Sequence, residues 1–325
     1  MGRLQRIYYN AIFGGLGGLL GWLLFGQLVD PAWDWRTQAL LGGLLIGAVI
    51  GSFVVSVEAL LDRSLVRYAR YAAVGVLLGG IGGLIGFYVG DWINYLIVST
   101  VGSGGVTPAV APLIVLARGF GWMLFGLALG VGEGIAARSS RKISYGVVGG
   151  CLGGFVGGVV FAILMLILSP GDSSYVWGQA IGLIVLGACI GSFTAAVEEL
   201  FKPAAVKVLR GWQEGREYPI VKPVQVLGRD EGVDILLLRD MRVEKRHAQI
   251  RWENGRFLLV NTNAPAAATL VNEEPVADAV ELHDGDRIQL GNIVLKFLMR
   301  AAKQKPGPRK SSAPPIARAV GPRSG

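Results

Sequence analysis

Six long apolar runs fill the first two thirds of the chain and constrain its fold more than any other feature. They lie near residues 10–28, 39–61, 71–90, 112–137, 144–168 and 177–200. Each is roughly 20 residues long, the length at which a helix crosses about 30 Å of hydrocarbon. The sequence therefore predicts an all-α polytopic membrane domain over residues 1–201, made of six transmembrane helices.

Basic residues in the short loops predict how these helices are oriented. On one side lie Arg3, Arg6, Arg63, Arg67, Arg70, Arg138, Arg141, Lys142, Lys202, Lys207 and Arg210. The loops on the other side carry mainly aspartates, with Arg36 and Arg118 as the basic exceptions. Because positively charged loops stay in the cytosol, we expect a multi-pass protein of the plasma or inner membrane with both termini cytosolic.

Glycine patterns recur along these runs and predict an internal repeat. The odd-numbered runs share Gly-Gly-x-Gly-Gly-x-x-Gly at residues 14–21 and 79–86, and at 150–157 with Cys151 as the second residue. Residues 47–58 and 187–198 share a pattern that begins with Gly-Ala and ends with Val-Glu, whereas the fourth run keeps only Gly126 and Gly130. We therefore expect three glycine-rich helical hairpins, each entering from the cytosol.

Glycines four residues apart form a glycine zipper, because they lie on one helix face and let another backbone approach closely. This pattern indicates close packing of helices, and the same faces leave association of several copies open. A second interpretation is that the hairpins enclose a conducting or substrate-binding path, since repeated hairpins also build transporters and channels.

Three glutamates near the cytosolic ends of the even-numbered runs are the residues on which such a path would depend. Glu58 and Glu198 occupy the same repeat position, and Glu133 lies one turn away on the same face. They could form an acidic ring at a pore mouth. Alternatively, each pairs with a basic residue at the end of a helix. The candidates for that role are Arg63, Arg138 and Lys202.

The composition changes after Phe201, from apolar and glycine-rich to that of an ordinary soluble domain. Short alternating runs follow at residues 206–209, 218–221, 224–227, 248–252, 257–260, 288–290 and 293–298. Asn254-Gly255 and Gly291-Asn292 are typical of hairpins and turns. These runs predict an all-β sandwich over residues 204–299.

The soluble part also carries an ordered set of short motifs. In chain order they are Gly228-Arg229, Asp234-Ile235, Lys245-Arg246-His247-Ala248, Leu270-Val271-Asn272, Asp284-Gly285-Asp286-Arg287 and Leu290-Gly291. Together they resemble the forkhead-associated (FHA) domain, a β-sandwich that recognises phosphothreonine with the loops at one end. The resemblance implies a recognition module.

By this resemblance, Arg229 donates to the phosphate and His247 supports the loops. A guanidinium suits phosphate because its fixed fork of N–H donors binds two oxygens. Glu244 stands where the family has a phosphate-binding serine, so an acceptor-only anion replaces a neutral donor. Repulsion between Glu244 and the phosphate, which carries about −1.5 to −2 charge, would weaken binding.

The second recognition loop also departs from the family pattern. Residues 261–268 read NTNAPAAA, with alanines and a proline where a hydroxyl and an amide are expected. Thr262 and Asn263 would substitute for them if the register of the loop shifts.

Three roles for the sandwich follow and remain open. It could be a degenerate sandwich that makes protein contacts, or it could bind a phosphopeptide weakly through Arg229, Lys245 and Arg246. It could also bind an unphosphorylated partner, with Glu244 paired either to that partner or internally to Arg229.

Residues 300–325 are rich in Lys, Arg, Pro and Ala, a composition that cannot bury a core. We expect a disordered basic tail that is solvated or drawn to anionic headgroups, and no nucleic-acid partner, because no aromatic platform lies nearby. The glycine runs lack the ending of a nucleotide-binding loop, and the 2 histidines and 2 cysteines form no metal motif. We therefore expect no catalysis, cofactor or metal.

These observations predict an integral membrane protein that presents an FHA-like recognition or scaffolding module to a cytosolic protein partner in signalling, with weakened or lost phosphothreonine binding. The alternative is a small transporter or channel that the cytosolic module regulates.

Overall fold

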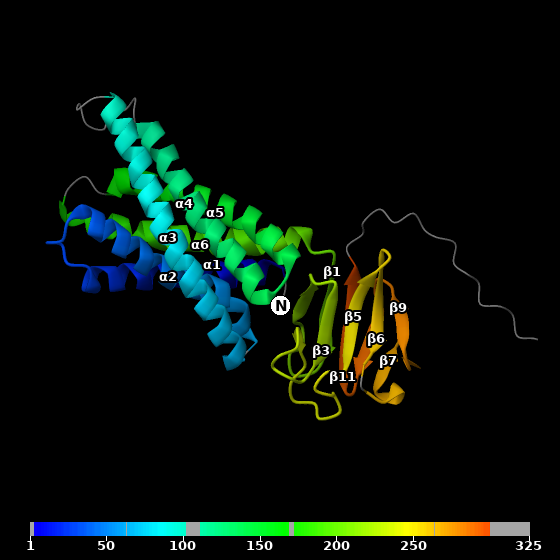
Figure 1. The fold of residues 1–325 in the computed structure, drawn as a ribbon. Coiled ribbons are helices and arrows are strands. Elements are labelled where there is room, and N and C mark those ends of the chain that lie inside the picture. The colour runs from blue at the N-terminus through cyan, green and yellow to red at the C-terminus, as the bar shows by residue number, and fades with distance from the viewer. Residues whose placement is uncertain (1–2, 63, 102–110, 169–171, 263, 300–325) are drawn as a thin grey trace, which may run out of the picture.

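The computed structural model describes residues 3–62, 64–101, 111–168, 172–262 and 264–299, and they form a bundle of long helices with a β-sandwich at one end (Figure 1). The helices are α1 (Arg3–Leu28), α2 (Trp35–Leu61), α3 (Leu65–Val101), α4 (Ala111–Ala137), α5 (Ser140–Leu168) and α6 (Asp172–Phe201). By length and composition, all six are long and apolar enough to cross a membrane. Six apolar helices followed by a sandwich is the architecture that the sequence predicted.

The helices close into a ring, in which each packs against its sequence neighbours and α6 returns to α1. The even-numbered helices also meet, since α2 contacts both α4 and α6. Their inward side chains, together with Phe161 of α5, form an apolar core. That core comprises Ile46, Ile50, Val54, Trp122, Phe125, Leu129, Phe161, Leu183, Leu186 and Ile190. Large side chains therefore fill the centre of the bundle.

Glycines face one another where the helices approach most closely. A Cβ atom at Gly47 would collide with the carbonyl oxygen of Gly79, and a Cβ atom at Gly79 would collide with that of Gly47. The same reciprocal contact joins Gly51 to Gly75, Gly126 to Gly150, Gly130 to Gly146 and Gly14 to Gly187. These glycine faces are therefore occupied by neighbours in the same chain, so they offer no free surface to a second copy.

The sandwich has two sheets with strand orders β2-β1-β11-β10-β7-β8 and β4-β3-β5-β6-β9. The strands are β1 (Ala204–Arg210), β2 (Glu217–Ile220), β3 (Val224–Gly228), β4 (Ile235–Leu236), β5 (Ala248–Glu253), β6 (Arg256–Asn261), β7 (Thr269–Val271), β8 (Glu274–Pro275), β9 (Ala279–Leu282), β10 (Arg287–Leu290) and β11 (Ile293–Met299). Strands β4, β7, β8 and β9 lie outside the runs expected from the sequence. Each has only two to four residues, which is too short to show an alternation of apolar and polar side chains.

The core of the sandwich lies between the sheets and is made by alternate residues of the strands. Leu227, Ile250, Leu259, Leu295 and Phe297 are among its fully buried members. Phe257 and Phe297 meet edge to face across the two sheets, with ring centroids 5.3 Å apart. This packing holds in place the strands β3, β5 and β6, whose ends carry the loops of the candidate site.

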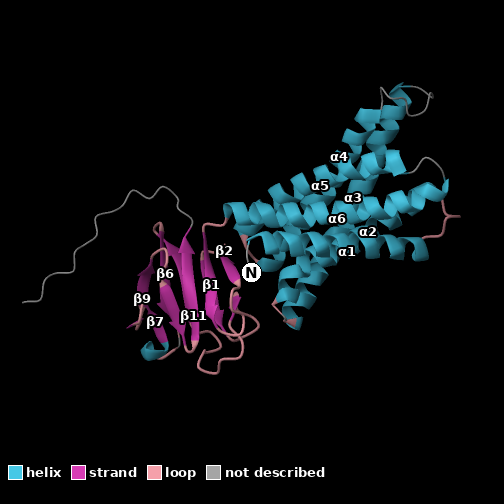
Figure 2. Ribbon diagram, turned by 180° about the vertical axis from the view of Figure 1, so that it is seen from behind, coloured by secondary structure: helices cyan, strands magenta, loops and turns pink. Residues whose placement is uncertain are grey.

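The sandwich lies at the end of the bundle where α1 begins and where α2 turns into α3 (Figure 2). Arg216 of the β1–β2 loop pairs with Asp62 and donates to the carbonyl oxygen of Leu61 over 2.8 Å. Ser139, between α4 and α5, donates to the carbonyl oxygen of Val221 over 3.1 Å. These contacts fix the position of the sandwich against the helical bundle.

Candidate functional site

Three loops meet at one end of the sandwich because β3, β5 and β6 are neighbours in one sheet. The backbone N–H of Arg229 donates to the carbonyl oxygen of Glu244 over 3.1 Å, joining the β3–β4 and β4–β5 loops. Thr262 N–H donates to the carbonyl oxygen of His247 over 3.2 Å and joins the β6–β7 loop to them. The fold therefore brings Arg229, Glu244, His247 and Thr262 together, whereas Asn263 lies outside the described residues.

Arg229 is half-buried and presents an unsatisfied donor. Its Nε atom is buried without a hydrogen-bond partner. Among the described residues its guanidinium forms no ion pair, so the internal pair with Glu244 that the sequence left open is not formed. A buried donor without a partner costs free energy that an incoming acceptor would recover.

Gly228, the last residue of β3, lets the β4–β5 loop pack closely against the chain. A Cβ atom there would collide with the carbonyl oxygen of Lys245 and would lie 3.0 Å from that of Glu244. The glycine before Arg229 is therefore required by the close packing of the β4–β5 loop.

Glu244, Lys245 and Arg246 are exposed on the β4–β5 loop. Together with Arg229 they place three cations and one anion at this end of the sandwich. The surface can therefore attract a negatively charged ligand, and Glu244 opposes that attraction.

His247 is fully buried and ties the loops together. Its Nδ1 accepts from the backbone N–H of Glu244 over 3.0 Å, and its Nε2 lies 3.0 Å from Thr269 Oγ1. Since Nδ1 is an acceptor, the proton resides on Nε2, which donates to the threonine. Burial lowers the pKa of His247 below its ordinary value. The geometry suits a supporting role and leaves no free ring nitrogen for a ligand.

The β6–β7 loop is held by Asn261, which the sequence reasoning missed. Its amide nitrogen donates to the carbonyl oxygens of Ala264 and Val276 over 2.9 and 3.0 Å. A polar residue at the end of a strand was the available signal. With Asn261 fixing the loop, the exposed Thr262 stands beside the loop that carries His247.

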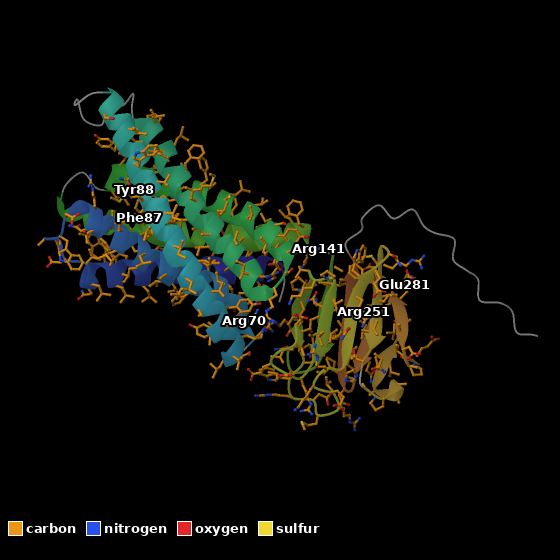
Figure 3. All side chains as sticks on the ribbon, in the orientation of Figure 1. Arg70, Phe87, Tyr88, Arg141, Arg251 and Glu281 are labelled. Carbon is orange, nitrogen blue, oxygen red and sulfur yellow. The ribbon has the colours of Figure 1, made fainter. Side chains whose placement is uncertain are left out.

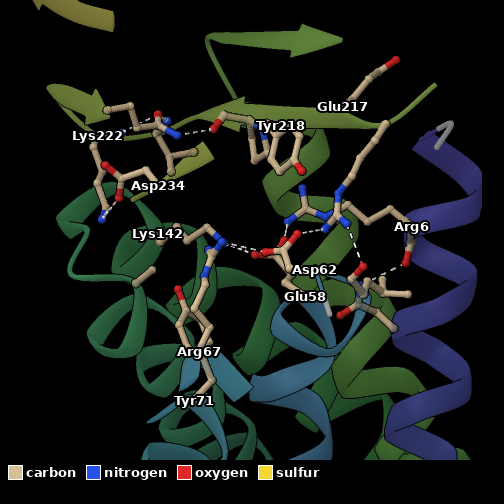
Figure 4. A pocket seen from close by; sticks show the side chains of 17 residues that line it. Arg6, Glu58, Asp62, Arg67, Tyr71, Lys142, Glu217, Tyr218, Lys222 and Asp234 are labelled. Atoms are coloured by element: carbon tan, nitrogen blue, oxygen red, sulfur yellow. Dashed lines mark hydrogen bonds and ion pairs between the residues drawn. The ribbon is translucent and has the colours of Figure 1, made fainter. Parts of the chain in front are cut away.

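The three glutamates lie at the end of the bundle next to the sandwich. Carboxylate oxygens of Glu58, Glu133 and Glu198 lie within 4.8 Å of one another. Lys142 Nζ lies 2.7 Å from Glu58, 3.0 Å from Glu133 and 3.5 Å from Glu198. Arg6 pairs with Glu58 (Figure 4). It also pairs with Glu198 over 2.8 Å. Two protein cations thus lie among the three carboxylates and balance part of their charge.

The partners of these glutamates among the described residues are Lys142 and Arg6, which the sequence did not predict. Lys202 pairs with Glu199 over 2.6 Å and lies 3.6 Å from Glu217. Among the described ion pairs Arg138 has none with the three glutamates, and Arg63 lies outside the described residues. Closure of the ring brings α1 beside α6, so that Arg6 reaches Glu198, 192 positions along the chain. Lys142, at the start of α5, reaches glutamates of all three even-numbered helices.

A small cavity of about 80 Å³ separates this cluster from the sandwich. Arg6, Asp62, Lys142, Arg216 and Tyr218 are among the residues that line it (Figure 4). Deeper in the bundle, Val54, Ile50 and Leu129 belong to the apolar core. The glutamates therefore lie above a packed centre, and this arrangement lends no support to a pore.

Comparisons with known proteins agree on the C-terminal part. The FHA domain model matches residues 226–291. The glycogen accumulation regulator GarA of Mycolicibacterium smegmatis is 39% identical over 95 residues, which are 29% of this chain and 58% of that protein. The oxoglutarate dehydrogenase inhibitor of Corynebacterium diphtheriae is 33% identical over 111 residues, 33% of this chain and 76% of that protein.

Among solved structures, one from a study of phosphothreonine-dependent FHA domain interactions is 30% identical to this chain. It covers 30% of this chain and 98% of its own, with a TM-score of 0.28. The chain thus spans about three fifths of the first of the two relatives, and each likeness concerns about a third of the chain or less.

Proposed function

Because this chain belongs to the FHA-domain family through its C-terminal third, we propose that it is a multi-pass membrane protein presenting a phosphopeptide-recognition module to the cytosol. In this proposal it acts as a recognition or scaffolding component in signalling and carries out no catalysis. The two relatives support this, because their names describe a regulator and an inhibitor.

The observation that carries the proposal is the unpartnered Arg229. A phosphothreonine phosphate would supply acceptors to the buried Nε donor and to the other N–H groups of the guanidinium. Because Glu244 does not occupy Arg229, the ligand need not displace an internal ion pair. Lys245 and Arg246 would add attraction to phosphate or acidic residues of the partner, and Thr262 and Asn263 would contact the peptide beside the phosphate.

Glu244 sets the expected strength of binding. Two unit charges 4 Å apart interact by about 4 kcal/mol at an effective dielectric of about 20. Glu244 is exposed, so water and salt screen this repulsion to about 1 kcal/mol, or roughly fivefold in affinity. We therefore propose a weak phosphothreonine site, in which the carboxylate limits binding to partners that reach the membrane surface at high local concentration.

The membrane placement rests on the six apolar helices and on the position of the basic residues. Arg70 and Arg141 lie at the end of the bundle next to the sandwich, and Phe87 and Tyr88 lie toward the other end (Figure 3). The positive-inside rule then assigns the end next to the sandwich to the cytosol. We propose a membrane domain over residues 1–201, the sandwich over 204–299 and a basic tail over 300–325.

Peptide titration tests the recognition proposal. Full-length protein in detergent would be titrated with fluorescent peptide libraries in phosphothreonine and unmodified forms, and binding would be read by anisotropy. Arg229→Ala should abolish phosphate-dependent binding, and Glu244→Ser should strengthen it about fivefold. Arg256→Ala is the matched control, because Arg256 pairs with Glu281 on an exposed hairpin away from the loops. Equal affinity for both peptide forms would refute phosphate recognition.

Protease accessibility tests the orientation. In inverted vesicles, protease added outside should cut the sandwich from the bundle. In right-side-out vesicles the sandwich should stay protected until detergent is added. The reverse result would place the recognition module on the wrong side for this function.

A further inference from the structure

A larger cavity lies at the end of the bundle remote from the sandwich. Its volume is about 220 Å³, and residues of all six helices line it. An apolar cavity of about 150 Å³ is enough to hold benzene, so this one has room for a ligand of about ten non-hydrogen atoms.

The cavity has an apolar base and aromatic sides. Ile46, Trp122 and Leu183 line it and also belong to the packed core, so the core closes it toward the sandwich. Phe25, Phe87, Phe161 and Met165 are its other large apolar neighbours. The cavity is therefore a closed-ended vestibule, a shape that suits binding rather than passage.

Three polar side chains line the same cavity, one from each even-numbered helix. They are Gln38, Arg118 and Gln179. The amide nitrogen of Gln38 donates to the carbonyl oxygens of Pro31 and Trp33 over 3.0 and 2.6 Å, which fixes that side chain. Within the described ranges, neither the Arg118 nor the Gln179 side chain has a hydrogen-bond or ion-pair partner.

Arg118 is the unusual member of this set. It lies in a candidate span, about two turns from the first residue of α4, and is only half-buried. A charge at such a place is costly unless it is paired, and charges of this kind commonly mark ligand or ion sites. The cavity thus combines one cation and two amides with aromatic walls.

We propose that this vestibule binds a small anionic amphiphile, with a carboxylate or phosphate head on Arg118 and Gln179 and a short apolar chain against Trp122, Phe87 and Phe161. The head would satisfy the guanidinium through charge-assisted hydrogen bonds. The chain would remove apolar surface of the aromatic side chains from water. The same chemistry is offered by a soluble short-chain acid and by the head of an anionic lipid.

Fluorescence quenching tests the proposal on the full chain in nanodiscs of zwitterionic lipid. The probe is bromo-octanoate with bromine at the chain end, which would quench Trp122. Bromo-octanol is the neutral probe of equal chain length. Saturable quenching by the acid, with at least about tenfold weaker binding of the alcohol, is the expected result.

Two variants locate the site. Arg118→Gln removes the charge and should abolish saturable quenching by the acid. Gly90→Leu should fill the cavity, since a Cβ atom at Gly90 would meet only Gly121 Cα, at 3.8 Å, and Gly90 is part of the lining. Gly26→Leu adds the same bulk near that end of the bundle, where a Cβ atom meets nothing within 4 Å, and should bind as the native chain does.

Adding anionic lipid to the nanodiscs distinguishes the two sources of the head. Competition with bromo-octanoate would identify a lipid occupant, and absence of competition would identify a soluble acid. Quenching that does not saturate, or equal affinity of the native, Arg118→Gln and Gly90→Leu chains, would overturn the proposal.

Discussion

Ser64 Oγ donates a hydrogen bond to Glu231 Oε2 over 2.9 Å, which joins the turn between α2 and α3 to the loop that carries Arg229. The β3–β4 loop, which carries the arginine of the proposed phosphate site, therefore contacts the helical bundle directly. Movement of the sandwich relative to the bundle would disturb this loop, so docking and recognition should be coupled.

Removal of the main docking contact should loosen the recognition loop. Arg216→Ala eliminates the ion pair with Asp62 and the bond to Leu61, leaving Asp62 with Arg67 at 2.8 Å. Loss of one partner of a buried pair costs about 3–5 kcal/mol, and less is expected here because Arg67 remains. Hydrogen–deuterium exchange of residues 229–236 should accelerate. Arg210→Ala, which removes an exposed arginine away from the junction, should leave the exchange of residues 229–236 unchanged. Equal protection of these residues in both variants would contradict the coupling between docking and recognition.

A methyl group at a helix contact should destabilise the bundle. In Gly47→Ala the new Cβ would collide with the carbonyl oxygen of Gly79 and would lie 2.9 Å from Gly83 Cα. Overpacking of this kind costs about 1–3 kcal/mol, which outweighs the roughly 1 kcal/mol gain in helix propensity. Gly26→Ala adds the same methyl in open space and should be neutral or stabilising. Thermal stability in detergent, read by size-exclusion chromatography, compares the two, and equal stability would argue against the close glycine contacts.

Removal of Lys142 should be among the most damaging single changes in the bundle. Lys142→Met leaves three clustered carboxylates, with Arg6 as the remaining cation on two of them. An unpaired buried charge costs about 3–5 kcal/mol. Adding Glu133→Gln to that variant removes one of the charges and should restore part of the loss. Thermal unfolding of the two variants measures the loss and its partial recovery. If Lys142→Met alone were as stable as the native chain, Lys142 would not stabilise the cluster.

Acid should weaken the sandwich through His247. Because burial lowers the pKa of the folded histidine, the unfolded chain binds its proton more tightly. The stability that neutral His247 contributes is therefore fully present above the unfolded pKa of about 6.5 and is lost as pH falls through the lower folded value. Calorimetric unfolding between about pH 7.5 and pH 5.5 should show the sandwich transition moving to lower temperature.

The matched control for acid sensitivity is His247→Gln, which keeps polar atoms near Thr269 but has no proton to gain in this range. That variant should start less stable and lose less stability on acidification. An equal shift in both chains would assign the acid sensitivity to other groups.

The residues of the proposed recognition site could be predicted in part because their motifs are local. Gly228-Arg229 and His247 were placed from short patterns, and the fold brings them together through adjacent strands. The absence of an ion pair between Arg229 and Glu244 could not be read from the sequence, since both residues were known but their side-chain directions were not. Asn261 was missed for a similar reason, because its role depends on hydrogen bonds to the carbonyl oxygens of Ala264 and Val276.

The sequence by itself determined the six apolar helices and the β-sandwich, because hydropathy, alternation and turn residues act over short stretches of chain. Only the tertiary structure decided which cations pair with Glu58, Glu133 and Glu198, and that Arg118 lines a cavity with Gln38 and Gln179. These features depend on α6 closing against α1 and on the even-numbered helices meeting at the centre. Such contacts join residues up to 192 positions apart, and no local pattern specifies them.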